Sequence, residues 1–227
     1  MKPSKIIVAL DNNNLKETIN IVKKLKKEAF AFKIGYEFFF NFGIENYKLI
    51  EKENFKIFLD LKLHDIPNTV KNGIEAIAKL KPYFTTIHIS GGDEMQKAAI
   101  KSKKNIKILG VSILTSLNSK QTNKFYFNKD INNIISKFTK SAILNNLDGV
   151  VCSPQEIKII KSIAPKNLLI ITPGIRPVNY KRIDDQKRIM TPIEAINAGA
   201  DYLVIGRPIT KAKNPLLELQ SINSSIV

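Results

Sequence analysis

The stretch Phe58-Leu-Asp-Leu-Lys-Leu-His-Asp-Ile-Pro-Asn-Thr69 carries three charged residues, Asp60, Lys62 and Asp65, in an otherwise apolar run. Residues i and i+2 of a β-strand point to the same face, so Asp60 and Lys62 are expected to project side by side. Pro67 marks the first turn of a following helix, which places Asp65 on the connecting loop. Charges held together at the end of a buried strand are costly unless paired, and this favours a functional site over a purely structural ion pair.

The length and composition indicate one globular domain. The chain has 227 residues, 44% of them hydrophobic, which is enough for one sizeable core, so we expect a single domain over residues 1–227. No apolar run reaches the roughly 18 residues that span a membrane, and the N-terminus has no signal-peptide pattern, so we expect a cytoplasmic location. The single cysteine, Cys152, lies in an apolar run and is expected to be a buried, inert thiol.

The formal net charge of +16 raises the question of a polyanionic partner. The lysines are scattered, however, and form only short clusters such as Lys101-Ser-Lys-Lys104. The chain has no tryptophan and no basic motif interleaved with aromatic residues. The sequence therefore favours a solvated basic surface without nucleic-acid or membrane binding, and a small anionic substrate fits the charge equally well.

Strands and helices are expected to alternate along the whole chain. The expected strands cover residues 5–10, 31–35, 55–61, 85–90, 108–114, 149–152, 168–171 and 202–205. Helix signals follow each strand; among them are a helix over residues 67–80, a helix capped by Asp93, and one final helix that begins near Pro208 and ends before Ser224. The polar segment 177–188 is typical of a mobile lid.

Eight strand and helix units with strands that are apolar throughout imply a parallel sheet buried on both faces. The economical closure is an α/β fold, the (β/α)₈ or TIM barrel, whose active sites lie at the carboxyl ends of the strands. Unusual residues fall at those ends: Asp11, Lys33, Asp60, Lys62, Thr115, Ser153, Arg176, Gly206 and Arg207. An open doubly wound sheet is the alternative, but the Gly-x-Gly-x-x-Gly turn expected after its first strand is absent.

Seven segments, taken in chain order, resemble the orotidine 5′-phosphate decarboxylase family in its compact bacterial form. They are Val8-Ala-Leu-Asp11, Phe32-Lys-Ile-Gly35, Asp60-Leu-Lys-Leu-His-Asp-Ile-Pro-Asn-Thr69, Leu114-Thr-Ser116, Thr172-Pro-Gly-Ile-Arg176, Asp185-Gln-Lys-Arg-Ile-Met-Thr-Pro192 and Gly206-Arg-Pro-Ile-Thr210. The Asp-x-Lys-x-x-Asp element alone is shared with related sugar-phosphate decarboxylases and hexulose-phosphate synthases. The resemblance implies conversion of orotidine 5′-monophosphate to UMP, the last step of UMP synthesis, with no metal or organic cofactor.

The resemblance also implies the catalytic roles. Lys62 looks like the proton donor to C6 as CO₂ leaves, with its charge beside the developing carbanion. Asp60 is placed near the substrate carboxylate, where two charges about 4 Å apart at an effective dielectric of about 20 repel by roughly 4 kcal/mol. That repulsion is too small to carry the catalysis alone. Lys33 and Asp11 resemble the ligands of the ribose hydroxyls, with Lys33 also keeping Asp60 ionised; a helix cap is the alternative for Asp11.

Other implied contacts involve the phosphate, the pyrimidine and a second subunit. The catalytic residues that the resemblance implies are Lys62, Asp60, Lys33 and Asp65. Asp65 and Thr69 reach into the site of the neighbouring subunit in a homodimer. Ser153 is placed to hydrogen-bond the pyrimidine amide edge, although a strand-end serine is otherwise often a helix cap. The remaining implied substrate contacts are Thr115, Arg176, Gln186, Gly206 and Arg207, the last four of them around the phosphate.

Two alternative functions stay open on the sequence. A 3-keto-gulonate phosphate decarboxylase is expected to hold a divalent cation on its acidic groups and lacks the His-Asp-Ile-Pro-Asn-Thr extension. A non-enzymatic phosphate or nucleic-acid binding module has no need for Asp60 and Lys62 paired at a barrel mouth. His64 and His88 lack a ligand cluster, so His64 is expected to be a packed or hydrogen-bonding neighbour rather than a metal ligand.

Overall fold

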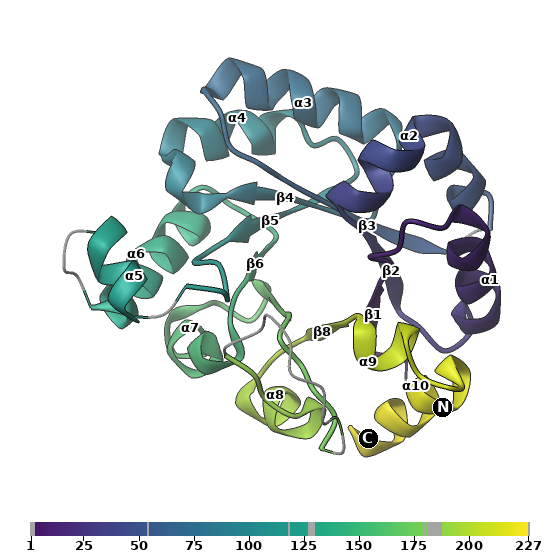
Figure 1. Ribbon diagram of the computed structural model, residues 1–227. Helices are drawn as coiled ribbons and strands as arrows, with labels where there is room; N and C mark the ends of the chain where they lie inside the picture. The colour runs from purple at the N-terminus through teal and green to yellow at the C-terminus, as the bar shows by residue number, and fades with distance from the viewer. Residues whose placement is uncertain are drawn as a thin grey trace.

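The computed structural model describes residues 3–53, 55–117, 119–126, 130–178, 180 and 188–226. Eight parallel strands form a closed barrel in chain order, and the last strand pairs with the first (Figure 1). The strands are β1 Ile6–Ala9, β2 Ala31–Ile34, β3 Lys56–Leu63, β4 Phe84–His88, β5 Lys107–Val111, β6 Gly149–Val151, β7 Leu169–Thr172 and β8 Tyr202–Ile205. The predicted (β/α)₈ barrel is confirmed.

The helices surround the ring of strands (Figure 1). The α-helices are α1 Leu15–Leu25, α2 Tyr36–Glu51, α3 Pro67–Lys79, α4 Asp93–Ser102, α5 Ser119–Phe125, α6 Ile131–Leu144, α7 Ile157–Ile163, α8 Pro192–Ala198, α9 Arg207–Thr210 and α10 Pro215–Ser225. Short 3₁₀ turns, η1 Ile89–Gly91 and η2 Pro154–Glu156, follow β4 and β6. None of the helices in these described ranges is long and apolar enough to cross a membrane.

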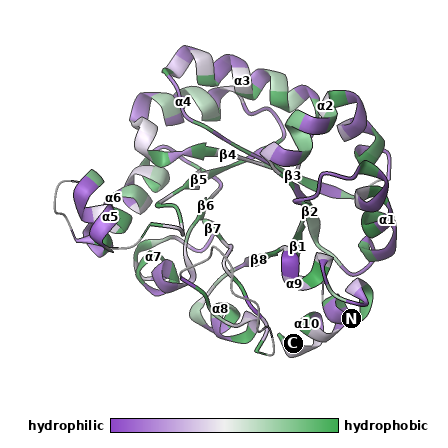
Figure 2. Ribbon diagram, in the orientation of Figure 1, coloured by the Kyte–Doolittle hydropathy of each residue, from purple (hydrophilic) through white to green (hydrophobic). Residues whose placement is uncertain are grey.

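Alternation along the strands produces two apolar layers. On β1, Ile7 and Ala9 belong to the cluster inside the barrel, whereas Ile6 and Val8 pack between the barrel and its helices. Figure 2 shows helices that carry both hydrophobic and hydrophilic residues, as helices that cover a barrel on one face do. Burial of both strand faces explains why the strands read as continuous apolar runs in the sequence.

Aromatic side chains fill the amino-terminal end of the barrel. Phe30, just before β2, stacks on Tyr202 at the start of β8 with ring centroids 4.0 Å apart, and Tyr83 meets Phe30 edge-on. The ammonium of Lys56 lies 4.2 Å from the centre of the Phe30 ring. The charged strand ends predicted from the sequence lie at the opposite, carboxyl-terminal end.

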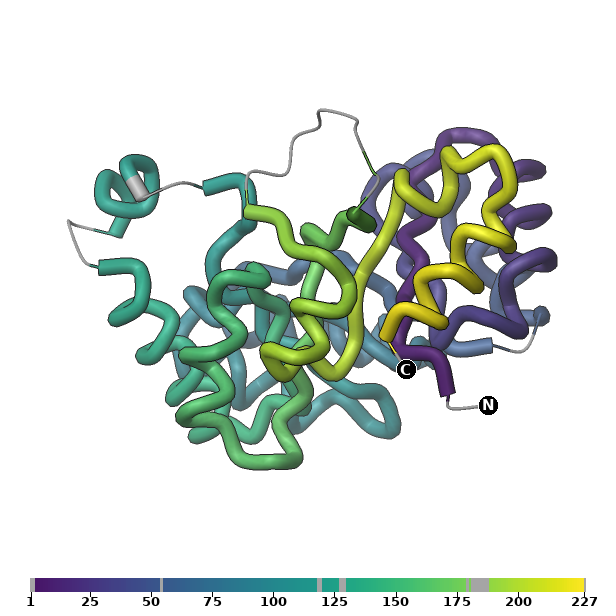
Figure 3. Tube along the Cα trace, turned by 90° about the horizontal axis from the view of Figure 1, so that it is seen from below, coloured from purple at the N-terminus to yellow at the C-terminus, as the bar shows by residue number. Residues whose placement is uncertain are grey.

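The two ends of the chain close the ring together. Figure 3 shows the C-terminal helix α10 beside the N-terminal part of the chain. Asn223 on α10 accepts a hydrogen bond from the Ser4 hydroxyl at 2.9 Å and donates one to the Glu28 carbonyl at 2.9 Å. These contacts reinforce the pairing of β8 with β1.

The prediction of one final helix was wrong, because α9 and α10 are separate helices. The Asn214 side chain accepts a hydrogen bond from the Leu217 N–H at 3.3 Å, and Pro215 occupies the first turn of α10. Asn followed by Pro is a helix-start signal. The sequence therefore contained the information for this break.

Two further details differ from the expectations. The N-cap of α4 is Gly92, and Asp93 is the first helical residue. Asp93 instead uses one carboxylate oxygen to accept hydrogen bonds from Ser141 of α6 and from Asn145, the residue that caps the C-terminus of α6, both at 2.7 Å. The polar stretch between β5 and α6 also contains a short helix, α5, which was not among the helices expected from the sequence.

Candidate active site

A cavity of about 790 Å³ opens at the carboxyl ends of the strands. Its lining includes eight residues predicted from the sequence, Asp11, Lys33, Asp60, Lys62, Thr115, Arg176, Gly206 and Arg207, and two further charged residues, Glu37 and Lys211. Apolar residues that include Ala9, Phe58, Val151 and Val204 complete the wall. Closure of the barrel therefore brings side chains from distant strand ends into one site.

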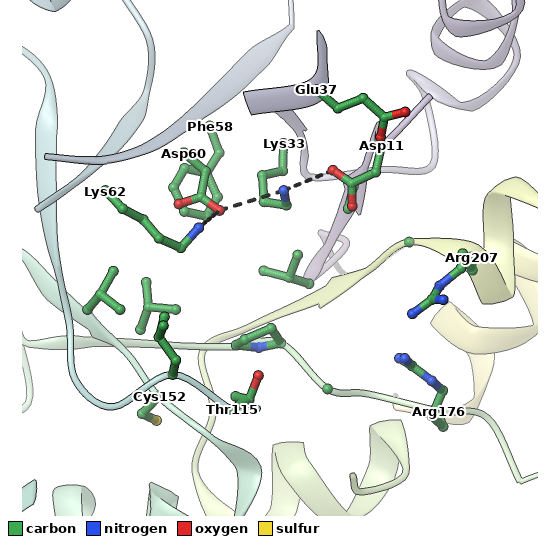
Figure 4. Close-up of a pocket in the computed structure, with 18 of the residues that line it drawn as sticks. Asp11, Lys33, Glu37, Phe58, Asp60, Lys62, Thr115, Cys152, Arg176 and Arg207 are labelled. Carbon is green, nitrogen blue, oxygen red and sulfur yellow. Dashed lines mark hydrogen bonds and ion pairs between the residues drawn. The ribbon is translucent and has the colours of Figure 1, made fainter. Parts of the chain in front are cut away.

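A row of alternating charges crosses one side of this cavity (Figure 4). The Lys33 ammonium lies 3.2 Å from Asp11 Oδ1 and 3.6 Å from Asp60 Oδ2. The Lys62 ammonium lies 2.8 Å from the same Oδ2 of Asp60. Each of the two central groups, Lys33 and Asp60, thus has an opposite charge on either side, and this arrangement favours the ionised form of both.

The pKa values of Lys33 and Asp60 are both shifted in favour of the charged form. Burial alone raises the pKa of Asp60, but Lys33, Lys62 and a hydrogen bond from Thr86 outweigh it and hold that pKa below its usual range. Burial also disfavours the charge on Lys33, yet Asp60 and Asp11 outweigh this effect and raise the pKa of Lys33. Asp60 and Lys33 are therefore both charged at neutral pH.

Strand β3 is irregular where it carries this cluster. Its pairing with β4 changes register between Leu59 and Leu63, and Lys62 has a φ of 45°. A left-handed backbone at a residue other than glycine carries about 1–3 kcal/mol of strain. Asp60 and Lys62 do meet as predicted, but β3 is not the regular strand that the prediction assumed at this point.

Asp60, Lys33 and Lys62 form a group that we call the Asp60 cluster. Two arginines lie across the cavity from it. Figure 4 shows the guanidinium groups of Arg176, after β7, and Arg207, at the start of α9, facing one another. Gly206 precedes Arg207, and a Cβ atom there would lie only 3.3 Å from Ala9 Cβ. Paired guanidinium groups suit a phosphate, because each can donate two parallel hydrogen bonds to its oxygens.

Comparisons with known proteins point to one family, in agreement with the geometry of the site. The model of the Orotidine 5′-phosphate decarboxylase / HUMPS family matches residues 4–222. The chain belongs to this family. The "Orotidine 5′-phosphate decarboxylase" of Wigglesworthia glossinidia brevipalpis is 43% identical over 231 residues, covering 100% of this chain and 99% of that protein. The protein of the same name from Aliivibrio fischeri strain MJ11 is 39% identical, and the match covers 100% of this chain and 98% of that protein.

The solved structures agree with the sequence comparisons. The crystal structure of orotidine 5′-phosphate decarboxylase from Lactobacillus acidophilus superposes with a TM-score of 0.84 at 36% identity, covering 97% of this chain and 98% of that one. An uncharacterized conserved protein from Geobacillus kaustophilus also gives 0.84, at 27% identity. The resemblance to the orotidine 5′-phosphate decarboxylase family that the sequence indicated is confirmed.

A second buried ion pair in this decarboxylase-family barrel was not predicted. Arg188 Nη1 donates to Glu156 Oε1, and Arg188 Nη2 donates to the Leu114 carbonyl at 3.0 Å. Glu156 Oε2 accepts from the Ser112 hydroxyl and the Ser153 N–H, both at 3.2 Å. Burial raises the pKa of Glu156 even though Arg188 opposes the shift. The pair joins the segments after β5 and β6 to residue 188.

The predicted lid, residues 177–188, is described only in part. Residues 179 and 181–187, which include Gln186, lie outside the described residues. Arg188, at the C-terminal end of this segment, is only 8% exposed, and the mobility of the segment stays a prediction. Beside the lid, Ile175 pairs with Met190, and the Arg176 N–H donates to the Met190 carbonyl at 3.0 Å. The two segments that flank the lid are thus held together.

Among the residues that the structure describes, three predicted site residues lie outside the cavity lining of their own chain: Ser153, Asp65 and Thr69. Ser153 is fully buried and its hydroxyl accepts a hydrogen bond from the Gln155 N–H at 3.4 Å, which is the helix-cap alternative considered for it. Asp65 and Thr69 are exposed, and Asp65 accepts a hydrogen bond from the Ile66 N–H at 2.6 Å. Substrate contact by all three stays a prediction.

The two histidines contact one another, and the cysteine is buried. The rings of His64 and His88 pack with centroids 5.2 Å apart. Within the described part of this family member, no group of three or more His, Cys, Asp or Glu residues is arranged to hold a metal ion. Cys152 is buried, and burial raises the pKa of its thiol. Cys152 is thus a buried thiol, as predicted, whereas His64 is exposed and only its ring contact with His88 is seen, so its role stays a prediction.

Proposed function

We propose that the chain converts orotidine 5′-monophosphate to UMP and CO₂ in pyrimidine biosynthesis. The observation that carries the proposal is the 2.8 Å contact of Lys62 with Asp60 in a cavity whose other side presents Arg176 and Arg207. The substrate has a carboxylate on its pyrimidine ring and a phosphate at its other end. The cavity has charged side chains at both of its sides, so it fits a molecule that is charged at both ends. Membership of the family supports the same reaction.

Lys62 is the proposed proton donor. When the bond from C6 to the carboxylate breaks, its electron pair stays on C6, and the Lys62 ammonium transfers a proton to that carbon. Before the transfer, the same positive charge stabilises the developing carbanion. The ion pair with Asp60 aims Lys62 at the reacting carbon, and the product UMP leaves with hydrogen at C6.

Asp60 and its neighbours are proposed to hold the substrate. Asp60 faces the departing carboxylate, and their repulsion of roughly 4 kcal/mol at about 4 Å is relieved as CO₂ leaves. Lys33 keeps Asp60 ionised and, with Asp11, binds the ribose hydroxyls. Proposed contacts to the rest of the substrate are Thr115, Ser153, Arg176, Gln186, Gly206 and Arg207.

We also propose a homodimer with shared sites. Ile66, next to Asp65 in the chain, is 66% exposed, and the stacked rings of Tyr36 and Phe40 on α2 are 47% and 79% exposed. The Tyr36 hydroxyl donates a hydrogen bond to the Leu61 carbonyl on β3, the strand that leads to Asp65. Such a grouping of exposed apolar side chains is typical of a protein interface. A second copy that covers it can receive Asp65 and Thr69 in its own cavity. The proposed compartment is the cytoplasm, where the substrate and product are used.

An absorbance assay for loss of orotidine 5′-monophosphate tests the reaction. We expect decarboxylation at the same rate with and without EDTA, because the proposed mechanism uses no metal or organic cofactor. Complete inactivation by EDTA that Mg²⁺ reverses would favour a metal-dependent sugar-phosphate reaction instead. Absence of decarboxylation under both conditions would reject the proposed function.

Subunit mixing tests the shared site. Lys62→Ala and Asp65→Ala homodimers are both expected to be nearly inactive. In a heterodimer both defects fall in one site and the other site is intact, so random reassortment restores about a quarter of wild-type sites. The measurement is activity after the two variants are unfolded and refolded together, with size-exclusion chromatography to confirm dimers. Confirmed heterodimers without recovered activity would place Asp65 in the site of its own chain.

A further inference from the structure

Thr86 lies on β4 beside the irregular part of β3 and is fully buried. Its hydroxyl oxygen accepts a hydrogen bond from the Lys62 backbone N–H at 2.9 Å. The same hydroxyl donates its proton to Asp60 Oδ1 at 2.9 Å. A threonine hydroxyl can donate one hydrogen bond and can also accept hydrogen bonds through its lone pairs. The Thr86 hydroxyl therefore binds both members of the Asp60–Lys62 pair at once.

The hydrogen bond to Lys62 is made at the point of backbone strain. The register of β3 against β4 changes between Leu59 and Leu63, and Lys62 adopts its φ of 45° within that interval. A strained backbone persists only when the surrounding structure fixes it, and a buried N–H that loses its partner is destabilising. The Thr86 hydroxyl supplies that partner to Lys62 from the neighbouring strand.

The hydrogen bond to Asp60 separates the roles of its two carboxylate oxygens. Oδ1 accepts from Thr86, whereas Oδ2 lies 2.8 Å from the Lys62 ammonium and 3.6 Å from that of Lys33. Fixing Oδ1 fixes the rotation of the carboxylate group. Oδ2 is thereby held toward the two ammonium groups and the cavity.

We propose that Thr86 is a positioning residue for the decarboxylation: its hydroxyl locks the Asp60 carboxylate and the Lys62 backbone into the arrangement that aims the proton donor. The inference rests on the proposed function. Thr86 is not among the residues that line the cavity, so it acts through Asp60 and Lys62 and not by touching the substrate. Its loss is therefore expected to lower kcat and leave KM nearly unchanged.

The adjacent Thr85 supplies a matched control. It is also fully buried on β4, but its hydroxyl donates to the Leu59 carbonyl at 2.9 Å. Thr86→Val is expected to lower kcat about ten- to a hundredfold, because two hydrogen bonds of the pair are lost together. Thr86→Ser keeps the hydroxyl and is expected to stay within about threefold of wild type. Thr85→Val is expected to keep the wild-type kcat.

The pH dependence gives a readout that a packing defect does not move. Without the Thr86 hydrogen bond the pKa of Asp60 rises, so the acidic limb of the kcat profile shifts to higher pH in Thr86→Val and not in Thr85→Val. A ¹³C titration of the Asp60 carboxylate measures the same shift without substrate. It therefore distinguishes failure of this inference from failure of the proposed reaction.

Thr86→Ala serves as a second variant with the same expectations if Thr86→Val does not fold. A wild-type kcat and an unmoved Asp60 titration in the folded variant would overturn the inference. An equal loss of kcat in Thr85→Val would also overturn it, because general damage to β4 would then explain the effect. Loss in the Thr86 variants with rescue by Thr86→Ser would support it.

Discussion

Asp60 and Glu156 are both buried carboxylates paired with cations, yet their pKa values move in opposite directions. Burial raises the pKa of each group. At Asp60, two ammonium groups, those of Lys33 and Lys62, more than reverse this effect, whereas the single guanidinium of Arg188 at Glu156 does not. The second cation at Asp60 therefore favours the ionised carboxylate more strongly than the one cation at Glu156 does.

The two clusters also differ in what surrounds them. The Asp60 cluster lines the cavity and includes a strained residue, Lys62. Glu156 and Arg188 lie outside the cavity lining, and their hydrogen bonds go to the chain segments after β5 and β6. We infer that the Asp60 cluster performs the chemistry and that the Glu156–Arg188 pair holds the loops around it.

Removal of the proposed proton donor gives the largest expected effect. Lys62→Ala is expected to lower kcat by at least about a thousandfold, because both proton transfer and charge stabilisation are lost. Lys103→Ala is a suitable control, since Lys103 pairs with Asp148 at 2.7 Å but does not line the cavity. Steady-state kinetics of the two variants measure the difference. A Lys62→Ala enzyme within tenfold of wild type would remove Lys62 from the chemistry.

Breaking the second cluster is expected to affect folding more than chemistry. Arg188→Met leaves the buried Glu156 without its cation, and such losses lower the free energy of unfolding by about 3–5 kcal/mol. Urea denaturation measures this change, with kcat expected within about threefold of wild type if the folded state keeps its loops. A variant as stable as wild type would show that the pair does not hold the fold.

The phosphate side of the cavity is expected to give a smaller effect, on binding. Arg207→Ala is expected to weaken phosphate binding about ten- to a hundredfold, because a charge-assisted contact contributes roughly 1.5–3 kcal/mol. The change is measured as KM and as the dissociation constant of UMP. Lys213, an exposed lysine that does not line the cavity, provides the control Lys213→Ala. Equal affinities in both variants would refute the phosphate assignment of Arg207.

The pH dependence of stability gives the smallest expected effect and has opposite signs at the two carboxylates. The lowered pKa of Asp60 adds stability that is present above about pH 4 and is lost as pH falls through the folded-state pKa. The raised pKa of Glu156 adds stability that is present below about pH 4 and is lost as pH rises. Urea denaturation of wild type, Asp60→Asn and Glu156→Gln at a series of pH values separates the two contributions to the free energy of unfolding. If both contributions changed with pH in the same direction, this account would be contradicted.

Much of the fold and the site was predictable because its determinants are local in the sequence. Each strand is a short apolar run, and the barrel places their ends together, so Asp11, Lys33, Asp60 and Arg207 could be assigned to one mouth before the structure was known. The break at Asn214 was equally local. It was missed although the cap and proline signals stood in the sequence.

The features that could not be predicted depend on contacts between distant segments. The φ of Lys62 follows from the register of β3 against β4, which an alternation rule for one strand does not contain. Glu156 and Arg188 are 32 positions apart, and neither carries a motif that names its partner. The two hydrogen bonds of Thr86 likewise appear only once its strand lies beside β3.

The most direct test compares one variant from each cluster. The rate of CO₂ release from orotidine 5′-monophosphate and the free energy of unfolding are measured on the same samples of Asp60→Asn and Glu156→Gln. We predict that Asp60→Asn lowers kcat by about a hundredfold or more, since Lys62 loses its charged partner, while Glu156→Gln keeps kcat within about threefold and loses stability. If kcat instead falls in both variants in proportion to their loss of stability, the division between a catalytic and a holding cluster is contradicted.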